Sequence, residues 1–476
     1  MHQPTMHQAN DVPANDDAPE TIPGAAMSTR RSTRPRDAMG FGLAALNKLA
    51  GAGVIDRLKL RKPTERAVYE ATRTGFRAVG AANRRFAATG PTGPAGTRGP
   101  AERPAAAPQR ALFDLTPTDE QAMIVHASAE FAAEQLRPAA PAADQDCAAP
   151  APLLARAVDE LGVGQLTVPE SLGGFGGERS VTTGVLVNEA LAHGDMGLAL
   201  ACLAPAAVST ALTLWGDADQ QAGYLPSFVS GGENGPLAAA LTVLEPHVLF
   251  DPFALRTVAR RVPGGFVLDG VKSLVPRADS AELFVVGAML DGAPALFLVE
   301  SATSGVQIES EPAMGLRAAR LGRLLLDGVH LPDSAVLGDG TAYGDCIRLS
   351  RIGWAALALG TCRAVLDYVI PYANEQQAFG EPISHRQAVA FMVANIGIEL
   401  EGARLVTLRA ASRAEQGMPF ARESALARRL TSEYGMQIGS NGVQLLGGHG
   451  YVKEHPVERW YRDLRAAGVM EGVVLV

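Results

Sequence analysis

Residues 444–451 read QLLGGHGY, and Arg-Asp at 462–463 and Glu-Gly at 471–472 follow them. The stretch closes the last of three long helical patterns, at 344–377, 384–416 and 420–445, in which apolar residues recur every three to four positions. Three such patterns in succession predict a helical bundle. The paired glycines let the backbone approach a bulky anion and offer it amide donors, although glycine is also an ordinary end to a helix.

Glu471 is the single acidic residue of the apolar stretch at 469–476. A carboxylate among apolar side chains is poorly hydrated, which suits a general base. A lone glutamate at this position is equally compatible with a solvated end of the chain. The residues alone leave both interpretations open.

The region before the bundle, 236–338, has the shorter period of β-strands. Its apolar and β-branched runs fall at 265–275, 282–290, 295–300 and 324–331. Asp-Gly pairs, which favour tight hairpin turns, occur at 269–270, 291–292 and 327–328. We therefore predict a compact antiparallel β domain with hairpin turns at these pairs.

Residues 111–232 again carry helical patterns, interrupted by the turn-rich stretch PESLGGFGG at 169–177. The residues Thr-Pro-Thr-Asp at 116–119 predict a helix start with a capping box and with proline at the first helical position. Helices, then strands, then helices do not alternate, which argues against a doubly wound nucleotide-binding fold. The predicted class is mainly α with a central β domain (α+β).

Residues 1–110 differ from the rest in charge. The net charge is −4 over residues 1–27, +12 over 28–110 and −16 over 111–476. We interpret 1–38 as a polar tail, with Met27 as an alternative start, and 90–110 as a flexible Gly/Pro/Ala linker. Between them, 40–88 predicts a basic amphipathic helix. Such a helix lies on an anionic membrane surface, docks on a partner, or packs its apolar stripe on the protein body.

The overall composition limits the class of protein. The chain has 476 residues, 47% hydrophobic and 19% charged, which excludes a disordered chain. The four cysteines are scattered, so we expect neither a disulfide framework nor a metal site. The acidic body argues against nucleic-acid binding, and neither an uninterrupted apolar run of 18 residues nor a secretory signal is visible. We expect a cytoplasmic protein whose basic helix could reach the inner face of the membrane.

Four motifs, in order, resemble the acyl-CoA dehydrogenase family. VPESLGGFG at 168–176 is similar to the family's vPExxGGxG stretch, and Gly-Val-Lys at 270–272 to the GxK hairpin of its β domain. YANEQQAFGEPI at 372–383, with Gln387, resembles YAxERxxFGxPI…Q. QLLGGHGY with the later Arg-Asp and Glu-Gly resembles QxxGGxGY…RD…EG. The likeness covers the chain from about residue 111 to residue 476.

The resemblance implies a fold of three parts, namely an N-terminal helical domain, an antiparallel β domain and a C-terminal four-helix bundle. In this chain we expect the helical domain at 111–235, the β domain at 236–340 and the bundle at 341–476. Residues 1–110 are then an N-terminal extension added to a catalytic fold.

The resemblance also implies a flavin enzyme that oxidises an acyl-CoA thioester to the α,β-enoyl thioester. Glu471 aligns with the catalytic base, which takes the α-proton while a hydride leaves the β-carbon for FAD. Some members carry the base just before the arginine of the first bundle helix. Here Ser350 precedes Arg351, which leaves Glu471 as the candidate base. Arg351 and Gly472 are expected to contact the substrate.

Seven residues are expected to contact FAD by the same likeness. Gln444, Gly447 and Gly448 align with positions that contact the FAD pyrophosphate of a neighbouring subunit, which implies a homodimer or homotetramer. The other expected cofactor residues are Glu245, Gln376, Phe379 and Gln387.

Several flavin-side positions depart from the family pattern. Leu244 replaces a threonine, and the Gly-Ser pair expected shortly after it is missing. Leu274 and Pro276 replace an aromatic and a Thr/Ser, Gln376 replaces a phosphate-binding arginine, and Val473 replaces a threonine. Each lost charge-assisted hydrogen bond is worth about 1.5–3 kcal/mol. We therefore expect weaker FAD binding or an altered flavin geometry.

Three functions remain open from the sequence. The leading one is FAD-dependent dehydrogenation of an acyl-CoA, with electrons passed to an electron-transfer flavoprotein. A second is another flavin reaction on the same scaffold, an oxidase or a monooxygenase, although the retained base disfavours a monooxygenase. The third is a catalytically degenerate member that binds acyl-CoA or a partner without turnover. The lost flavin-side residues favour the third, and the retained Glu471 opposes it.

Overall fold

The computed structural model describes residues 116–175, 180–229 and 236–476. The tail, basic helix and linker expected in residues 1–110 lie outside the described residues. The helical domain, the sheet and the bundle come in the expected order along the chain, so the predicted fold class is confirmed.

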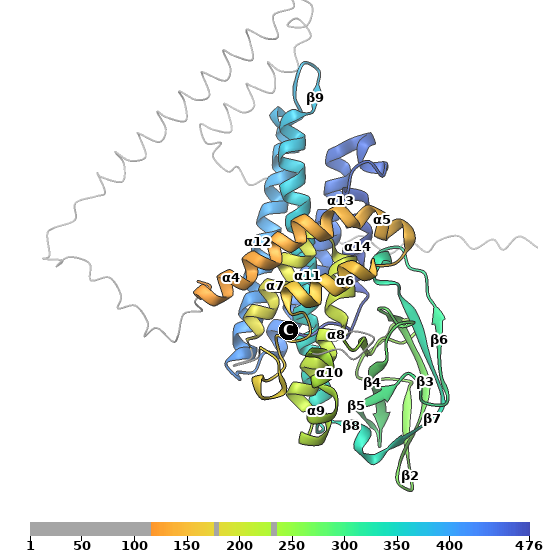
Figure 1. The fold of residues 1–476 in the computed structure, drawn as a ribbon. Helices are drawn as coiled ribbons and strands as arrows, with labels where there is room; N and C mark the ends of the chain where they lie inside the picture. Colours follow the sequence, from red (N-terminus) through yellow and green to blue (C-terminus); the bar gives the residue numbers. More distant parts are fainter. Residues whose placement is uncertain (1–115, 176–179, 230–235) are drawn as a thin grey trace, which may run out of the picture. The chain divides into compact units, whose positions relative to one another are not determined.

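The described residues of the first domain form helices joined by turns. Its two longest helices pack next to each other and against the bundle, so they form the centre of the body (Figure 1). The helices of this domain are α4 (Asp119–Phe131), α5 (Arg137–Asp146), α6 (Ala151–Leu161), α7 (Val181–Gly194), α8 (Met196–Trp215), α9 (Ala218–Tyr224) and α10 (Pro226–Val229).

The first described helix begins two residues later than the sequence predicts. Thr118 is the N-cap of α4, and its hydroxyl accepts a hydrogen bond from the Gln121 amide at 3.2 Å. The Gln121 side chain accepts in turn from the Thr118 amide at 3.1 Å, which completes the capping box. The prediction of Pro117 at the first helical position was wrong, because a longer Gln side chain at the third position reaches back to Thr118.

The β domain is one twisted sheet of eight strands in the order β6-β7-β3-β2-β4-β5-β8, with β1 beside β4. Most pairs are antiparallel, as predicted, but β4 pairs in parallel with both β1 and β2. The strands are β1 (Ala239–Thr242), β2 (Val258–Val262), β3 (Gly265–Val275), β4 (Leu283–Leu290), β5 (Ala293–Glu300), β6 (Val306–Ser310), β7 (Gly322–Pro332) and β8 (Val336–Leu337).

One of the three predicted Asp-Gly turns is confirmed. Asp291 and Gly292 both have positive φ, at 52° and 85°, and join β4 to β5 directly. The predictions for 269–270 and 327–328 were wrong, because both pairs lie inside long strands.

The two internal Asp-Gly pairs face each other at a bulge between β3 and β7. The Asp269 carboxylate accepts a hydrogen bond from the Gly328 amide at 2.8 Å, across the irregular part of the ladder. A Cβ on Gly270 would lie 2.5 Å from the Thr257 hydroxyl oxygen, so glycine is required there by close approach to β2. Gly270 thus serves packing between strands, whereas a Cβ on Gly328 would meet nothing within 4 Å and this glycine instead adopts a φ of +60°.

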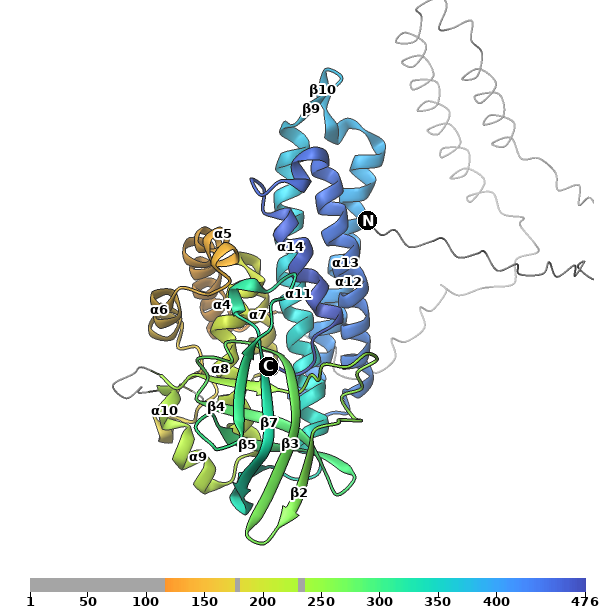
Figure 2. The same cartoon turned by 90° about the vertical axis from the view of Figure 1, so that its right-hand side faces the viewer.

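The C-terminal domain has three long helices and a short fourth one. α11 (Ala342–Glu375), α12 (Gln387–Glu415) and α13 (Ala421–Leu446) run side by side, and α14 (Val457–Leu464) packs on α13. A hairpin of β9 (Gln377–Ala378) and β10 (Glu381–Pro382) joins α11 to α12. Figure 2 shows this hairpin at the end of the bundle that points away from the sheet.

Among the residues that the structure describes, two helices are long and apolar enough to cross a membrane by length and composition alone, namely α8 and α11. Within their most apolar windows, 78% of α8 and 83% of α11 are buried inside the body. Their apolar surface is therefore used in the core of the folded chain, where they pack against α7, the sheet and the other bundle helices.

Candidate active site

Glu471 lies in the core, after α14 and a single 3₁₀ turn at Arg465–Gly468. The Met470 amide donates to the Ala466 carbonyl at 2.8 Å, which directs the chain inward. Glu471 is only 5% exposed, and Met470 and Val473 on either side are 1% exposed. The expected apolar flanks are present, and the solvated-end interpretation does not hold.

The Glu471 carboxylate itself lies between two guanidinium groups. Arg351 on α11 donates from Nη2 to Oε1 at 2.8 Å and from Nε to both oxygens at 3.2 Å. Arg428 on α13 lies with Nε 3.1 Å from Oε1. The expectation of a purely apolar environment therefore needs correction, because a buried carboxylate requires charged or polar partners. Oε1 has three nitrogen neighbours in the described contacts, whereas Oε2 has one.

The next residue anchors this arrangement through its backbone. The Gly472 carbonyl accepts from the Ser350 hydroxyl at 2.6 Å and from the Trp354 indole at 2.7 Å. Gly472 has φ of +71°, and a Cβ there would lie 2.7 Å from Val243 Cγ2. The Glu-Gly pair thus needs its glycine for backbone conformation and space, and Ser350 serves as its anchor on α11.

Arg428 was not identified from the sequence. Its Nη1 donates to the Met470 carbonyl at 2.7 Å and to the Ala467 carbonyl at 3.3 Å, in addition to the ion pair. Burial lowers the pKa of Arg428 from its usual value, and the Glu471 charge acts in the opposite direction. Nothing in the local pattern of α13 distinguishes this arginine from the other basic residues of the helix.

Glu245 binds other protein groups. Its oxygens accept from the Lys272 ammonium at 2.8 Å, from the Arg256 amide at 2.7 Å and from the Thr257 amide at 2.9 Å. Burial raises and Lys272 lowers the pKa of Glu245, with a net shift downward. Burial also lowers the pKa of Lys272 to about 8. The Glu245 carboxylate therefore holds β3 to the loop after β1, and the structure gives it no orientation toward a cofactor.

The donors at the edge of β3 are also engaged. The Ser273 hydroxyl lies 2.9 Å from both oxygens of Glu311, and the Leu274 amide donates to Glu311 at 2.8 Å. Leu274 and Pro276 have no polar side-chain atom to add. This edge offers fewer free donors to a flavin than the family pattern would.

The remaining expected cofactor residues gather at the tip of the bundle, which we define as the region around the β9–β10 hairpin and the end of α13. A Cβ on Gly447 or Gly448 would meet nothing within 4 Å, so both glycines face open space. Phe379 is 97% exposed with φ of +55°. The other members of this group are Gln376, Gln387 and Gln444.

The open space beside Gly447 and Gly448, the amide side chains and an exposed aromatic ring fit an anionic, ring-containing cofactor such as FAD, although the Gly447 amide itself donates to the Gln444 carbonyl. The tip also holds a cation that the sequence prediction missed, since the Arg386 guanidinium lies 5.6 Å from the centre of the Phe379 ring. Arg386 immediately precedes Gln387 in the motif, which could have drawn attention to it. Beside the tip, a cavity of about 500 Å³ is lined by Gln376, Tyr372 and His449, among others.

The bundle tip and Glu471 are far apart within one chain. Arg351 is the tenth residue of α11, and Gln376 is the C-cap of that helix, 25 residues further along the chain. At 1.5 Å per residue this is about 37 Å. One chain therefore does not bring the two groups of expected site residues together.

Three family models match the described body in order. They are the acyl-CoA dehydrogenase N-terminal domain at residues 118–232, middle domain at 238–329 and C-terminal domain at 339–474. Together they cover well over half of the sequence. The chain belongs to the acyl-CoA dehydrogenase family.

Individual relatives agree with this assignment. The chain is 33% identical over 366 residues to the short/branched chain specific acyl-CoA dehydrogenase of Rattus norvegicus, covering 75% of this chain and 83% of the relative. It is similar to the butyryl-CoA dehydrogenase structure from Megasphaera elsdenii, at 27% identity and a TM-score of 0.69, covering 76% of this chain and 96% of that one.

Another similar structure is the prolyl acyl carrier protein oxidase AnaB, at 25% identity and a TM-score of 0.67, covering 74% of this chain and 95% of that one. The structures similar to this chain thus include an oxidase as well as a dehydrogenase. This member of the acyl-CoA dehydrogenase family is an oxidoreductase and a flavoprotein.

Proposed function

We propose that this protein is an FAD-dependent acyl-CoA dehydrogenase in which Glu471 removes the α-proton of the thioester. The observation that carries the proposal is the buried Glu471 carboxylate, with Oε1 bound by Arg351 and Arg428 and Oε2 left with one contact at 3.2 Å. A base must reach its proton with a defined atom and orientation. Binding of one oxygen by two arginines from different helices supplies that orientation.

The reaction removes two hydrogens from the substrate, one from the α-carbon and one from the β-carbon, and each has its own acceptor. The α-hydrogen leaves as a proton to Glu471 Oε2, and its electron pair forms the new Cα–Cβ double bond. FAD, when bound, supplies the acceptor for the hydride that leaves the β-carbon. Proton and hydride together account for the two hydrogens that separate acyl-CoA from enoyl-CoA.

Arg351 and Arg428 have two roles in this proposal. Before the reaction they compensate the charge of a buried carboxylate, which would otherwise be expensive to hold in the core. During the reaction both arginines hold Oε1, and Arg351 Nε also lies 3.2 Å from the accepting Oε2, so the orientation of the carboxylate is fixed. Substrate contact by Arg351 and Gly472 remains part of the proposal, with Gly472 held close by its Ser350 and Trp354 anchors.

The bundle-tip residues would hold the FAD pyrophosphate. Because the tip lies about 37 Å along α11 from Arg351, it would serve the Glu471 of another copy of the chain, so we propose a homodimer or homotetramer. Glu245 is not needed for this role, since its carboxylate is used by Lys272 and two backbone amides. We propose an electron-transfer flavoprotein as the acceptor of the two electrons.

The test is the visible spectrum of the purified protein, followed by anaerobic addition of a panel of acyl-CoAs. We expect a bound flavin whose absorbance near 450 nm, the usual flavin band, bleaches with at least one thioester. A colourless protein that cannot be reconstituted with FAD would overturn the proposal and support a degenerate binding protein.

An oxidase is the second candidate, supported by the likeness to the prolyl acyl carrier protein oxidase. The dehydrogenase and the oxidase are distinguished by admitting air after the flavin has been reduced. A dehydrogenase stays reduced for minutes until an electron acceptor is added, whereas an oxidase reoxidises at once and forms hydrogen peroxide.

A further inference from the structure

The position of the acyl chain can also be inferred, and this inference rests on the proposed function. If Glu471 removes the α-proton, the rest of the acyl group must extend into apolar space next to this carboxylate. Two cavities of about 500 Å³ among the described residues are not lined by Glu471. The lining of one includes Leu214, Arg348 and Phe420, and that of the other includes Arg137, Tyr372 and His455. The apolar space beside Glu471 must therefore be sought in the core itself.

That space is filled by residues 473–476, which we call the VVLV segment. Val473 and Val474 are 1% exposed, Leu475 is 8% exposed and Val476 is 5% exposed. The first two belong to a core cluster with Trp354 and Leu191, whereas the last two belong to a second cluster. The segment thus runs from beside the carboxylate into the packing between the helices and the sheet.

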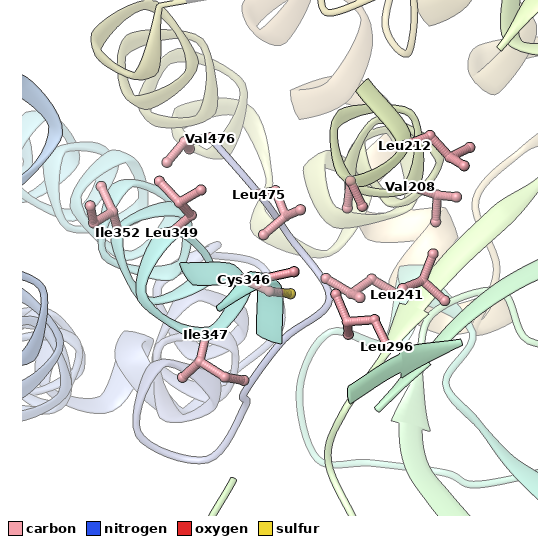
Figure 3. Close-up of a cluster of buried hydrophobic side chains, with 14 of the residues drawn as sticks. Val208, Leu212, Leu241, Leu296, Cys346, Ile347, Leu349, Ile352, Leu475 and Val476 are labelled. Carbon is pink, nitrogen blue, oxygen red and sulfur yellow. The ribbon is translucent and has the colours of Figure 1, made fainter. Parts of the chain in front are cut away.

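Figure 3 shows the second cluster around Leu475 and Val476. Leu349 and Ile352 of α11 lie on one side of the segment, and Val208 and Leu212 of α8 lie on the other. Leu241 and Leu296 from the sheet belong to the same cluster. An acyl chain placed here would contact the same aliphatic surfaces that the VVLV segment now covers.

Two glycines make room for the segment. A Cβ on Gly184 of α7 would lie 3.1 Å from Val476, and a Cβ on Gly353 of α11 would lie 3.0 Å from Val474. Real Cβ atoms seldom approach other carbons so closely in a packed core. Each helix therefore lacks a side chain at the point where the segment passes, and this leaves space for Val474 and Val476.

We propose that the VVLV segment occupies the inner part of the acyl pocket and restricts this enzyme to short acyl groups. The segment begins two residues after the base in the same chain, so its local concentration is far above that of any substrate. A short acyl group reaches Glu471 without entering the space of Leu475 and Val476. A long one must displace buried aliphatic side chains that are already well packed.

The test compares the wild-type protein with the double variant Leu475→Ala/Val476→Ala. Both substitutions shorten the segment and leave Glu471, Gly472 and their anchors in place. The matched control is Leu324→Ala/Val299→Ala, which removes the same atoms from fully buried positions in the separate core of the sheet. Anaerobic flavin bleaching is measured with butyryl-, hexanoyl-, octanoyl- and dodecanoyl-CoA.

We expect wild-type and control proteins to bleach with butyryl-CoA and to lose reactivity with increasing chain length. In the segment variant the ratio of octanoyl- to butyryl-CoA reactivity should rise about tenfold or more, since each buried methylene adds favourable transfer energy. If the double variant does not fold, Val476→Ala alone should shift the same ratio in the same direction.

Two results would overturn the inference while leaving the proposed function standing. One is a wild-type protein that reacts with dodecanoyl-CoA as readily as with butyryl-CoA. The other is an unchanged length profile in a folded segment variant. Bound flavin that no acyl-CoA bleaches, in any of the proteins, would instead contradict the proposed function itself.

Discussion

At the scale of single residues, Glu471 shows what sequence neighbours reveal and what they hide. Its flanks, Met470 and Val473, are apolar in the sequence and buried in the structure. Its charge partners Arg351 and Arg428 come from other helices, and Arg351 is 120 residues away. Local sequence therefore offered a buried carboxylate as one of two interpretations, and it did not indicate how the charge is compensated. The ion pair of Lys272 and Glu245 was likewise not visible from local sequence, because it joins β3 to the loop after β1.

Asp463 gives a residue-scale prediction about pH. It is fully buried and accepts a hydrogen bond from the Leu316 amide at 2.6 Å. Burial, with the nearby Asp195 charge, raises the pKa of Asp463 to about 8. The folded state then holds a proton up to about pH 8, whereas the unfolded chain releases it near pH 4. The stability from this group is present below about pH 4 and is lost as the pH rises toward 8.

Asp463→Asn cannot ionise and keeps an acceptor for the Leu316 amide. We expect the melting temperature of the variant, relative to wild type, to increase steadily between pH 5 and pH 8. The measurement is thermal unfolding by circular dichroism in buffers of matched ionic strength. A constant difference across this range would show that Asp463 is already ionised in the fold.

At the scale of elements, helices were predicted more accurately than turns. The patterns at 344–377, 384–416 and 420–445 lie within a few residues of α11, α12 and α13. Asp-Gly pairs were less informative, because the same dipeptide makes a hairpin turn at 291–292 and a bulge contact inside β3 and β7. The choice depends on the partner strand, which a local pattern does not contain.

The bundle tip provides an element-scale prediction with an internal control. Gly448→Val places its side chain in open space, so we expect unchanged folding but a loss of bound FAD of at least about tenfold in affinity. Gly450→Ala, two residues away, would bring a Cβ within 2.2 Å of the Val443 carbonyl oxygen and should destabilise the fold. Flavin content after gel filtration and melting temperature distinguish the two effects. Full flavin retention by Gly448→Val would show that the bundle tip does not bind the cofactor.

At the scale of the whole molecule, the separation between the tip and Glu471 is the main consequence of the fold. The sequence motifs identified both groups of residues, but their distance follows only from the length and direction of α11. In the proposed homo-oligomer, a site assembled from two copies of the chain would unite them. The 1–110 extension lies outside the described residues, and its predicted role at a membrane or partner stays a prediction.

If each active site is shared by two chains, two inactive variants with different defects should restore activity when they form a mixed dimer. A dimer of Glu471→Gln lacks the base, and a dimer of Gly448→Val lacks the cofactor site. A mixed dimer has one site with neither defect, so a random mixture of equal amounts should recover about a quarter of wild-type sites. Unfolding and refolding the two proteins together with FAD, then measuring butyryl-CoA dehydrogenation, checks this. No recovery in a mixture shown to contain mixed dimers would indicate that each chain builds its site alone.

The central claim is that Glu471 is the base, and the most direct measurement is stopped-flow flavin reduction in the Glu471→Gln variant. Glutamine keeps the shape of the side chain and cannot accept the proton, while the bundle tip is untouched. We predict that the variant retains FAD and that its rate of anaerobic bleaching by butyryl-CoA falls by about 10²–10⁴-fold or more. A flavin-loaded variant that bleaches at the wild-type rate would show that another group removes the α-proton, and would contradict the account.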